Sequence, residues 1–516
     1  MESMNIASNS NPVFKAQHFR GHLLIPLLLV IPAAVTRLKP MEQIQTFWVD
    51  SLFYVTLARN LFFSGYEILN VSHSHYPPLY PIIIAILHLI FGWAGDQVAM
   101  AKIVSFLGGV VMVPLLYLLS FGLFKDRFIS ISISIYTILN PYLILYSALV
   151  FTESLYSMVA VLILFLLHKQ YIGPAAFISG LAYLLRAEAI IFIVPIVYAC
   201  GLYQWKRLIK SGILFLTPVL PWMIRNFLIF DNPFQSGYFP ILSHNYGWNI
   251  RFLFNYFYTM GPIMVILSVL GIVLCFQRSC LPAILYIFCG NLLHCIWPFS
   301  YERFTLPYLV ILAIFAATGP GKLVALFSDK KEWKQITGIL TVILMFTLGI
   351  IAYRADLDPL VLQESTRSTA YVQAIKDLKA GGVQGSVITA DIGLVAYYGQ
   401  LPAVSLWSAK KSDIFEFIYE QYDQGARYII ISNYYYVDRR LKDILNASPL
   451  DPVIFPNSKA SAGSKTIILI PLGVFHCQQK YFLPDPSKVY ARKISREHRA
   501  EVRIYHIVKK ASHQAF

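Results

Sequence analysis

The chain has little charge, few cysteines and no cluster of metal-binding residues. Only 13% of its 516 residues are Asp, Glu, Lys or Arg, whereas 57% are hydrophobic and the mean hydropathy is +0.58. This scarcity of charge excludes a soluble globular protein and indicates a polytopic membrane protein. Five of the six cysteines lie in apolar runs, so we expect neither a disulfide framework nor a zinc site with ordinary spacing.

Long apolar runs are what the sequence has instead, and they extend from residue 22 to about residue 353. A membrane-spanning helix needs about 20 apolar residues, and alternating barrel strands do not produce such runs. We therefore expect a bundle of α-helices. The runs lie near residues 22–38, 77–93, 98–121, 128–146, 150–168, 172–186, 188–203, 209–229, 258–276, 280–297, 303–319 and 335–353.

The basic residues predict which of these runs cross the membrane. Lys and Arg accumulate in cytoplasmic turns, and all basic turns fall on one side only if residues 77–93 do not span. That run begins with Pro77, Pro78 and Pro81, which delay the start of its helix. We therefore expect about eleven spans and a large first extracytoplasmic loop, 39–97, with interfacial helices near 47–63 and 79–92.

Composition divides the chain into three parts. Residues 1–353 form the predicted transmembrane domain, residues 354–484 an extracytoplasmic α/β domain, and residues 485–516 a basic C-terminal tail. The net charge of +15 lies at the ends of apolar runs and in this tail, so we expect contact with lipid head groups and not with nucleic acid. Within the α/β domain we expect helices at 371–379 and 414–422, and strands at 386–390, 427–432 and 465–470.

Ionisable residues gather at the predicted outer ends of the helices. A charge facing hydrocarbon costs several kcal/mol, so these groups face water, protein or substrate. Asp50 and Glu153 are the candidate catalytic acids. The candidate substrate-binding residues, chosen because they could hold a phosphate or a sugar, are His75, Tyr76, Lys102, Arg186, Arg225, Tyr301 and Arg303.

Each assignment has a structural alternative. Asp50 stands where an N-cap would stand, and Glu153 starts a span, where the helix dipole favours an acid. Arg186 could pair only with Glu188, and Arg303 only with its neighbour Glu302. The two histidines at 73 and 75 do not complete a metal site, so the metal remains unknown.

Several short motifs, in this order, resemble the C-fold (GT-C) glycosyltransferases. The motifs are Asp50 with Ala58-Arg59-Asn60-Leu61, His75-Tyr76-Pro77-Pro78-Leu79-Tyr80-Pro81, Ala101-Lys102, Thr152-Glu153-Ser154, Leu185-Arg186-Ala187-Glu188, Pro221-Trp222-Met223-Ile224-Arg225-Asn226 and Tyr301-Glu302-Arg303-Phe304. Within this superfamily the chain is similar to the branch that contains protein O-mannosyltransferases and lipid A aminoarabinose transferases. The resemblance covers about residues 20–320.

The resemblance implies an activity. It implies an inverting transfer of a sugar from a polyprenyl-phosphate donor to a lipid, glycan or protein acceptor, with Asp50 as the base. Lys102 stands where the family commonly has an arginine. No cofactor is expected to be required, and a divalent metal stays open. The expected location is the bacterial inner membrane, with the active site and the C-terminal domain extracytoplasmic.

Two other classes of protein fit parts of the sequence. A transporter or lipid flippase would also carry charges near helix ends, but it should carry ionisable groups at the midplane and broken helices in related halves. An oligosaccharide ligase would use the same outer face with a preassembled glycan donor. The acids of this chain lie at outer boundaries, which favours glycosyl transfer.

Overall fold

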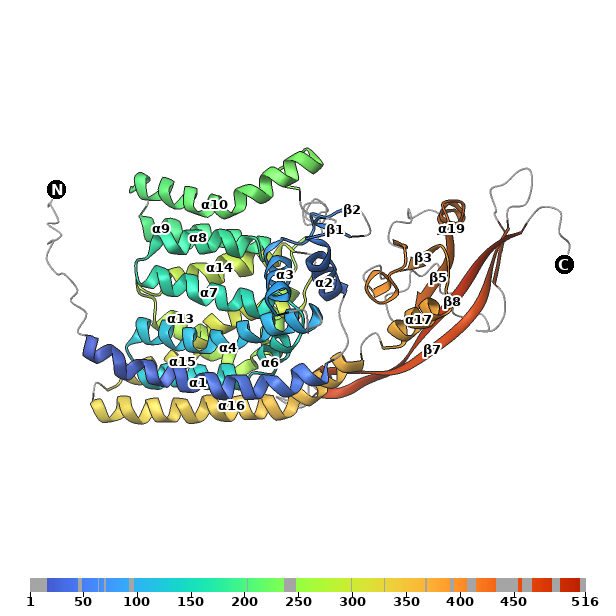
Figure 1. The fold of residues 1–516 in the computed structure, drawn as a ribbon. Coiled ribbons are helices and arrows are strands. Elements are labelled where there is room, and N and C mark those ends of the chain that lie inside the picture. The colour runs from blue at the N-terminus through green and yellow to red at the C-terminus, as the bar shows by residue number, and fades with distance from the viewer. Residues whose placement is uncertain are drawn as a thin grey trace.

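The computed structural model places a helical bundle beside a sheet (Figure 1). It describes residues 16–44, 49–63, 65–68, 71–91, 97–201, 203–235, 247–297, 299–328, 330–366, 369–389, 394–405, 414–432, 453–456, 466–484 and 492–510. The statements below concern these residues.

Helices make up the first two thirds of the described chain. They are α1 (Ala16–Gln43), α2 (Val49–Asn60), α3 (Leu79–Phe91), α4 (Gln97–Phe124), α5 (Arg127–Leu139), α6 (Pro141–Ala148), α7 (Glu153–His168), α8 (Ile172–Tyr183), η1 (Ala187–Phe192), α9 (Ile193–Cys200), α10 (Trp205–Phe230), α12 (Arg251–Thr259), α13 (Pro262–Leu274), α14 (Leu281–Cys295), η2 (Glu302–Thr305), α15 (Leu306–Ala325) and α16 (Lys331–Thr366). A two-stranded antiparallel sheet, β1 (Glu67–Ile68) and β2 (Val71–Ser72), lies between α2 and α3.

The helices are apolar enough for an integral membrane protein. Among the described residues, five are long and apolar enough to cross a membrane, or up to seven if the bent pairs α5–α6 and α12–α13 each cross as one span. The other apolar helices have 10–17 residues, and at 1.5 Å per residue such a helix is shorter than the hydrocarbon core of about 30 Å. The expected eleven spans would require four of these shorter helices to cross, so that number stays a prediction.

Two short helices occur where the first loop was expected to contain them. α2 has 12 residues and α3 has 13, and α3 begins at Leu79, directly after the proline pair. The run at 77–93 is thus too short to be a candidate span. In Figure 1, α2, α3 and the small sheet lie together at one end of the bundle, the end that also faces the C-terminal sheet.

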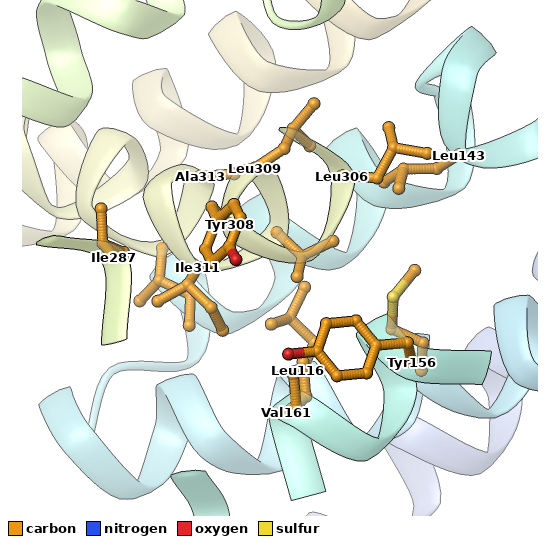
Figure 2. Close-up of a cluster of buried hydrophobic side chains, with 14 of the residues drawn as sticks. Leu116, Leu143, Tyr156, Val161, Ile287, Leu306, Tyr308, Leu309, Ile311 and Ala313 are labelled. Carbon is orange, nitrogen blue, oxygen red and sulfur yellow. The ribbon is translucent and has the colours of Figure 1, made fainter. Parts of the chain in front are cut away.

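The bundle core is made of close helix contacts and buried aromatic side chains. Figure 2 shows Tyr156 of α7 and Tyr308 of α15 within this cluster of apolar residues. At Gly108 of α4, an added Cβ would lie 2.8 Å from the backbone of Leu155. The missing side chain lets α4 approach the first turn of α7, which carries Glu153.

The C-terminal part holds a six-stranded mixed sheet in the order β4-β3-β5-β8-β7-β6. β3 is parallel to β4 and β5, and the remaining pairs are antiparallel. These elements are α17 (Thr369–Ala380), β3 (Ser386–Thr389), η3 (Val395–Gly399), β4 (Ala403–Ser405), α19 (Ile414–Asp423), β5 (Ala426–Ser432), β6 (Val453–Pro456), β7 (Thr466–Pro484) and β8 (Arg492–Lys510). The two predicted helices and three predicted strands all occur, although β7 is longer than expected.

Two expected boundaries differ from the structure. The transmembrane domain is expected to end at residue 353, but α16 continues to Thr366 and includes Pro359. The tail 485–516 was expected as a solvated basic segment, yet residues 492–510 form β8 between β5 and β7. Alternating apolar residues such as Val502, Ile504 and Val508 fit a strand despite the basic composition. The tail residues 485–491 and 511–516 lie outside the described part.

Candidate functional site

Four elements meet near Asp50 and bring distant charges together. Asp50 lies in the first turn of α2, Glu153 in the first turn of α7, Arg186 directly before η1, and Arg303 in η2. The short 3-10 helices η1 and η2 place Arg186 and Arg303 at the breaks that precede α9 and α15. Residues separated by up to 253 positions in sequence thus form one cluster, which we call the carboxylate network.

Asp50 is the most solvent-exposed acid of this network. Its Oδ1 accepts a hydrogen bond from the Tyr76 hydroxyl (2.7 Å), and its Oδ2 accepts one from Nη2 of Arg303 (2.8 Å). Burial alone would raise the pKa of Asp50, but the Arg303 charge and the two hydrogen bonds outweigh it and hold this pKa below its usual value. The carboxylate is therefore ionised at neutral pH, and its side chain is 25% exposed.

Glu153 is the buried acid of the network, with a side chain only 1% exposed. Its Oε1 accepts a hydrogen bond from Nη1 of Arg186 (2.9 Å) and lies 3.6 Å from Nε of Arg303. One carboxylate thus faces both arginines. This geometry fits a group that orients arginines better than one that reaches a substrate.

Arg303 is held by aromatic rings as well as by carboxylates. Its guanidinium carbon lies 4.9 Å from the ring centroid of Phe151, 5.2 Å from that of Phe304 and 5.4 Å from that of Tyr301. Such rings attract a cation and fix the plane of the guanidinium. Tyr301 itself is 42% exposed, so it is accessible beside the network.

The network continues inward through two residues that the sequence did not place in the site. Glu188 accepts two hydrogen bonds from Arg186, at 2.9 and 3.1 Å, and its Oε2 lies 3.5 Å from Nε2 of His294 on α14. The sequence suggested the pair of Glu188 with Arg186 but gave no role to it. His294 was missed because it ends an apolar run, and a lone histidine in such a run carries no signal of its partner.

Lys102 lies elsewhere and contacts protein backbone. Its Nζ donates to the carbonyl oxygens of Met41 (3.0 Å) and Ile44 (2.5 Å), at the end of α1. These carbonyls are among those that a helix C-terminus leaves without an intrahelical partner. Lys102 thus fixes the point where the chain leaves α1 toward α2, and it is 8% exposed.

Arg225 of α10 also contacts backbone oxygens. It donates to the carbonyls of His73 (2.8 Å) and Tyr66 (3.2 Å), and its guanidinium carbon lies 4.7 Å from the Trp222 ring centroid. Because both acceptors belong to the first loop, Arg225 ties that loop to α10. In this structure Arg225 thus binds protein backbone, whereas the sequence suggested that it would bind a phosphate.

His75 and Tyr76 lie beside Asp50, with the two rings in edge contact at 4.7 Å. Burial lowers the pKa of His75, and the neighbouring Asp50 opposes that shift. Burial lowers the pKa of His73 to about 3, assisted by His75 and Arg225. Nε2 of His73 accepts the backbone N–H of Tyr76 (3.2 Å), so His73 is a neutral residue that shapes the turn.

A small pocket borders this turn. It is lined by Ser74, His75, Pro77, Tyr183, Ala187, Trp222, Met223, Asn226, Pro233, Phe234 and Gln235. Within the described residues no group of three or more His, Cys, Asp or Glu side chains is arranged to hold a metal ion.

Solved structures with the same architecture identify the fold. ArnT from Cupriavidus metallidurans, the lipid A aminoarabinose transferase, is similar in its apo state with a TM-score of 0.55 and 13% identity, over 95% of this chain and 98% of that chain. The same protein bound to undecaprenyl phosphate gives a TM-score of 0.57 and 13% identity, over 93% and 97%. The chain has the GT-C fold.

A second GT-C protein shares this architecture. The Archaeoglobus fulgidus oligosaccharyltransferase, in a complex with Zn and sulfate, gives a TM-score of 0.55 and 12% identity over 79% of this chain and 67% of that chain. No protein-family model matches the chain, and no curated protein matches its sequence. The GT-C resemblance expected from the motifs is thus confirmed at the level of the fold.

Proposed function

We propose that the protein is an inverting glycosyltransferase that moves a sugar from a polyprenyl-phosphate donor to an acceptor hydroxyl or amine. We place the reaction on the extracytoplasmic face of a bacterial plasma membrane. The acceptor is a lipid, a glycan or a protein. Support for the donor class comes from the GT-C fold and from the similar ArnT structure, which is bound to undecaprenyl phosphate.

The observation that carries this proposal is the state of Asp50. Its carboxyl group accepts hydrogen bonds from Tyr76 and Arg303 and its side chain is 25% exposed, while Glu153 is 1% exposed. A general base must be ionised and must reach the proton that it takes. Among the acids of the carboxylate network, Asp50 meets both conditions best.

The reaction is a single in-line displacement at the anomeric carbon. The acceptor atom forms a bond to that carbon while the bond from the carbon to the phosphate oxygen breaks with its electron pair. Asp50 takes the acceptor proton, and polyprenyl phosphate leaves as an anion. The configuration of the sugar inverts because the acceptor attacks opposite the leaving group.

Arg303 and Arg186 supply the positive charge near the leaving group. The aromatic rings and carboxylates around them fix both guanidinium groups before the reaction, so little reorganisation is needed as negative charge develops. Arg303 also holds Asp50 in its ionised form. We assign Glu153 the role of orienting the two arginines.

Replacement of the base tests the proposal directly. Asp50→Asn should leave a folded, membrane-inserted protein but reduce transfer from a polyprenyl-phosphate sugar by at least about a hundredfold. Glu67→Gln is the matched control because Glu67 lies in the same loop and accepts only a weaker hydrogen bond from Ser72. Full transfer by Asp50→Asn would refute the assignment.

The donor class is tested separately with purified wild-type protein. We expect release of polyprenyl phosphate when a polyprenyl-phosphate sugar and an acceptor extract are supplied together, measured by mass spectrometry. Consumption of a nucleotide sugar in place of the lipid donor would contradict the proposal. Movement of the intact lipid donor between leaflets without its cleavage would indicate a flippase.

A further inference from the structure

The inner end of the carboxylate network contains a histidine with an unusual setting. His294 is 4% exposed and lies between two phenyl rings, stacked on Phe252 at 4.8 Å and on Phe304 at 5.3 Å. The edge of the Tyr308 ring lies near it at 5.7 Å. The imidazole is therefore packed against aromatic rings, and its nitrogens are its only polar atoms.

One of these nitrogens lies near a carboxylate. Nε2 of His294 lies 3.5 Å from Oε2 of Glu188. If Nε2 carried the lone pair, two acceptors would face each other at a buried position, which is unfavourable. A hydrogen on Nε2 is therefore the favourable arrangement, although at 3.5 Å the contact is longer than a hydrogen bond and neither ring nitrogen has a hydrogen-bond partner among the described residues.

Glu188 in turn controls Arg186. The two hydrogen bonds from Nε and Nη2 of Arg186 to Glu188 occupy one edge of the guanidinium, and Nη1 is left for Glu153. An N–H of His294 near Oε2 of Glu188 would hold this carboxylate in the orientation in which both of its oxygens accept from Arg186. Loss of that donor would let Glu188 rotate and would weaken the fixed position of Arg186.

We propose that His294 is a positioning residue for glycosyl transfer, whose Nε2–H attracts the Glu188 carboxylate across 3.5 Å and thereby helps to fix Arg186 against Glu153. His294 does not touch the substrate. This role rests on the proposed function, because Arg186 matters only if it stabilises a leaving anion. The geometry of the donor itself does not depend on that function.

Two substitutions separate this role from simple packing. His294→Phe keeps an aromatic ring between Phe252 and Phe304 but removes the donor. His294→Gln loses the ring stack but keeps an amide N–H near the position of Nε2. For a positioning residue, kcat should fall about tenfold in His294→Phe and less than about threefold in His294→Gln, with KM changed little in either variant.

A packing role predicts the reverse order, and that result would overturn the proposal. The matched controls are His168→Phe and His168→Gln, since His168 lies in the last turn of α7, at the opposite end of that helix from Glu153. Both controls should retain the wild-type kcat. Size-exclusion profiles of each variant show whether it folds.

A measurement of stability distinguishes failure of this proposal from failure of the proposed function. The thermal midpoints of His294→Phe, Glu188→Gln and the double variant form a cycle that needs no substrate. If His294 donates to Glu188, the Tm loss of the double variant should be smaller than the sum of the two single losses. Additive losses would refute the His294–Glu188 contact even if the enzyme transfers sugar, and a smaller combined loss would uphold it even if no transfer were found.

Discussion

Two pairs of cations in this protein have the same charge and different partners. Arg186 and Arg303 bind carboxylates in the carboxylate network, whereas Lys102 and Arg225 donate to backbone carbonyls at the borders of the first loop. The first pair lies next to the exposed acid Asp50. The second pair holds the segments that carry Asp50 and His75 in place.

The difference shows how a partner determines the use of a buried charge. A guanidinium against carboxylates can exchange one anion for another, so it can receive a phosphate when a substrate enters. A charge bound to helix-end and loop carbonyls replaces hydrogen bonds that the backbone would otherwise lack. We therefore expect loss of the first pair to reduce the rate and loss of the second pair to reduce stability.

Among the four cations, the largest effect on the rate is expected for Arg303. In Arg303→Met, Asp50 and Glu153 lose a shared cation, and transfer should fall by about 100- to 1,000-fold, as for loss of a donor that stabilises developing charge. The measurement is the initial rate with a polyprenyl-phosphate sugar in nanodiscs. Arg251→Met, an exposed residue at the start of α12, is the control and should keep full activity. A loss of less than fivefold would contradict the proposed role of Arg303 in stabilising the leaving phosphate.

A smaller effect is expected for the acid that the two arginines share. Glu153→Gln keeps the shape but loses the charge, so kcat should fall by roughly tenfold to a hundredfold, or about 1.4 to 2.8 kcal/mol. Glu332→Gln is the control, because Glu332 is an exposed acid in the first turn of α16. A loss of activity as large as that of Asp50→Asn and well beyond a hundredfold would instead indicate that Glu153 is itself a base.

For Lys102 and Arg225, which bind backbone carbonyls, we predict a loss of stability with activity retained. Lys102→Met removes two charge-assisted hydrogen bonds to the carbonyls of Met41 and Ile44, each worth about 1.5 to 3 kcal/mol. We expect Tm to fall by several degrees while kcat of the folded fraction changes less than about threefold. Lys39→Met, an exposed lysine of the same helix α1, should leave Tm unchanged. A wild-type Tm together with a kcat loss of about a hundredfold would instead support the expectation from the sequence that Lys102 binds the substrate.

The sequence predicted the parts of the fold that follow from hydropathy and turn chemistry. The proline pair before Leu79 predicted the late start of α3, and the helix and strand patterns beyond residue 353 predicted α17, α19, β3, β5 and the first part of β7. The strand β8 in the tail was not predicted. Its pairing with β5 and β7 is a long-range contact, and no local sequence pattern indicates such a contact.

The sequence predicted which residues belong to the candidate site better than it predicted their contacts. Asp50, Glu153, Arg186 and Arg303 do meet, because acids and arginines at helix ends on one side of a membrane share a narrow layer. Residue type alone does not predict which of the four cations bind carboxylates and which bind backbone carbonyls. That choice depends on where the breaks at η1, η2 and the end of α1 direct each side chain.

The smallest effect is expected for the hydroxyl of Tyr76 and appears in the pH dependence. The hydrogen bond from Tyr76 is one of the contacts that lower the pKa of Asp50, after the Arg303 charge. A base with a lowered pKa stays ionised in moderately acidic solution and loses activity as the pH falls through that pKa. In Tyr76→Phe the pKa of Asp50 should rise, so the acid limb of kcat/KM should move to higher pH, with a change below about threefold at pH 7. Tyr171→Phe, an exposed tyrosine before α8, is the control. An acid limb that stays in place would show that Tyr76 does not act on Asp50, and one that moves to lower pH would contradict its role as a donor.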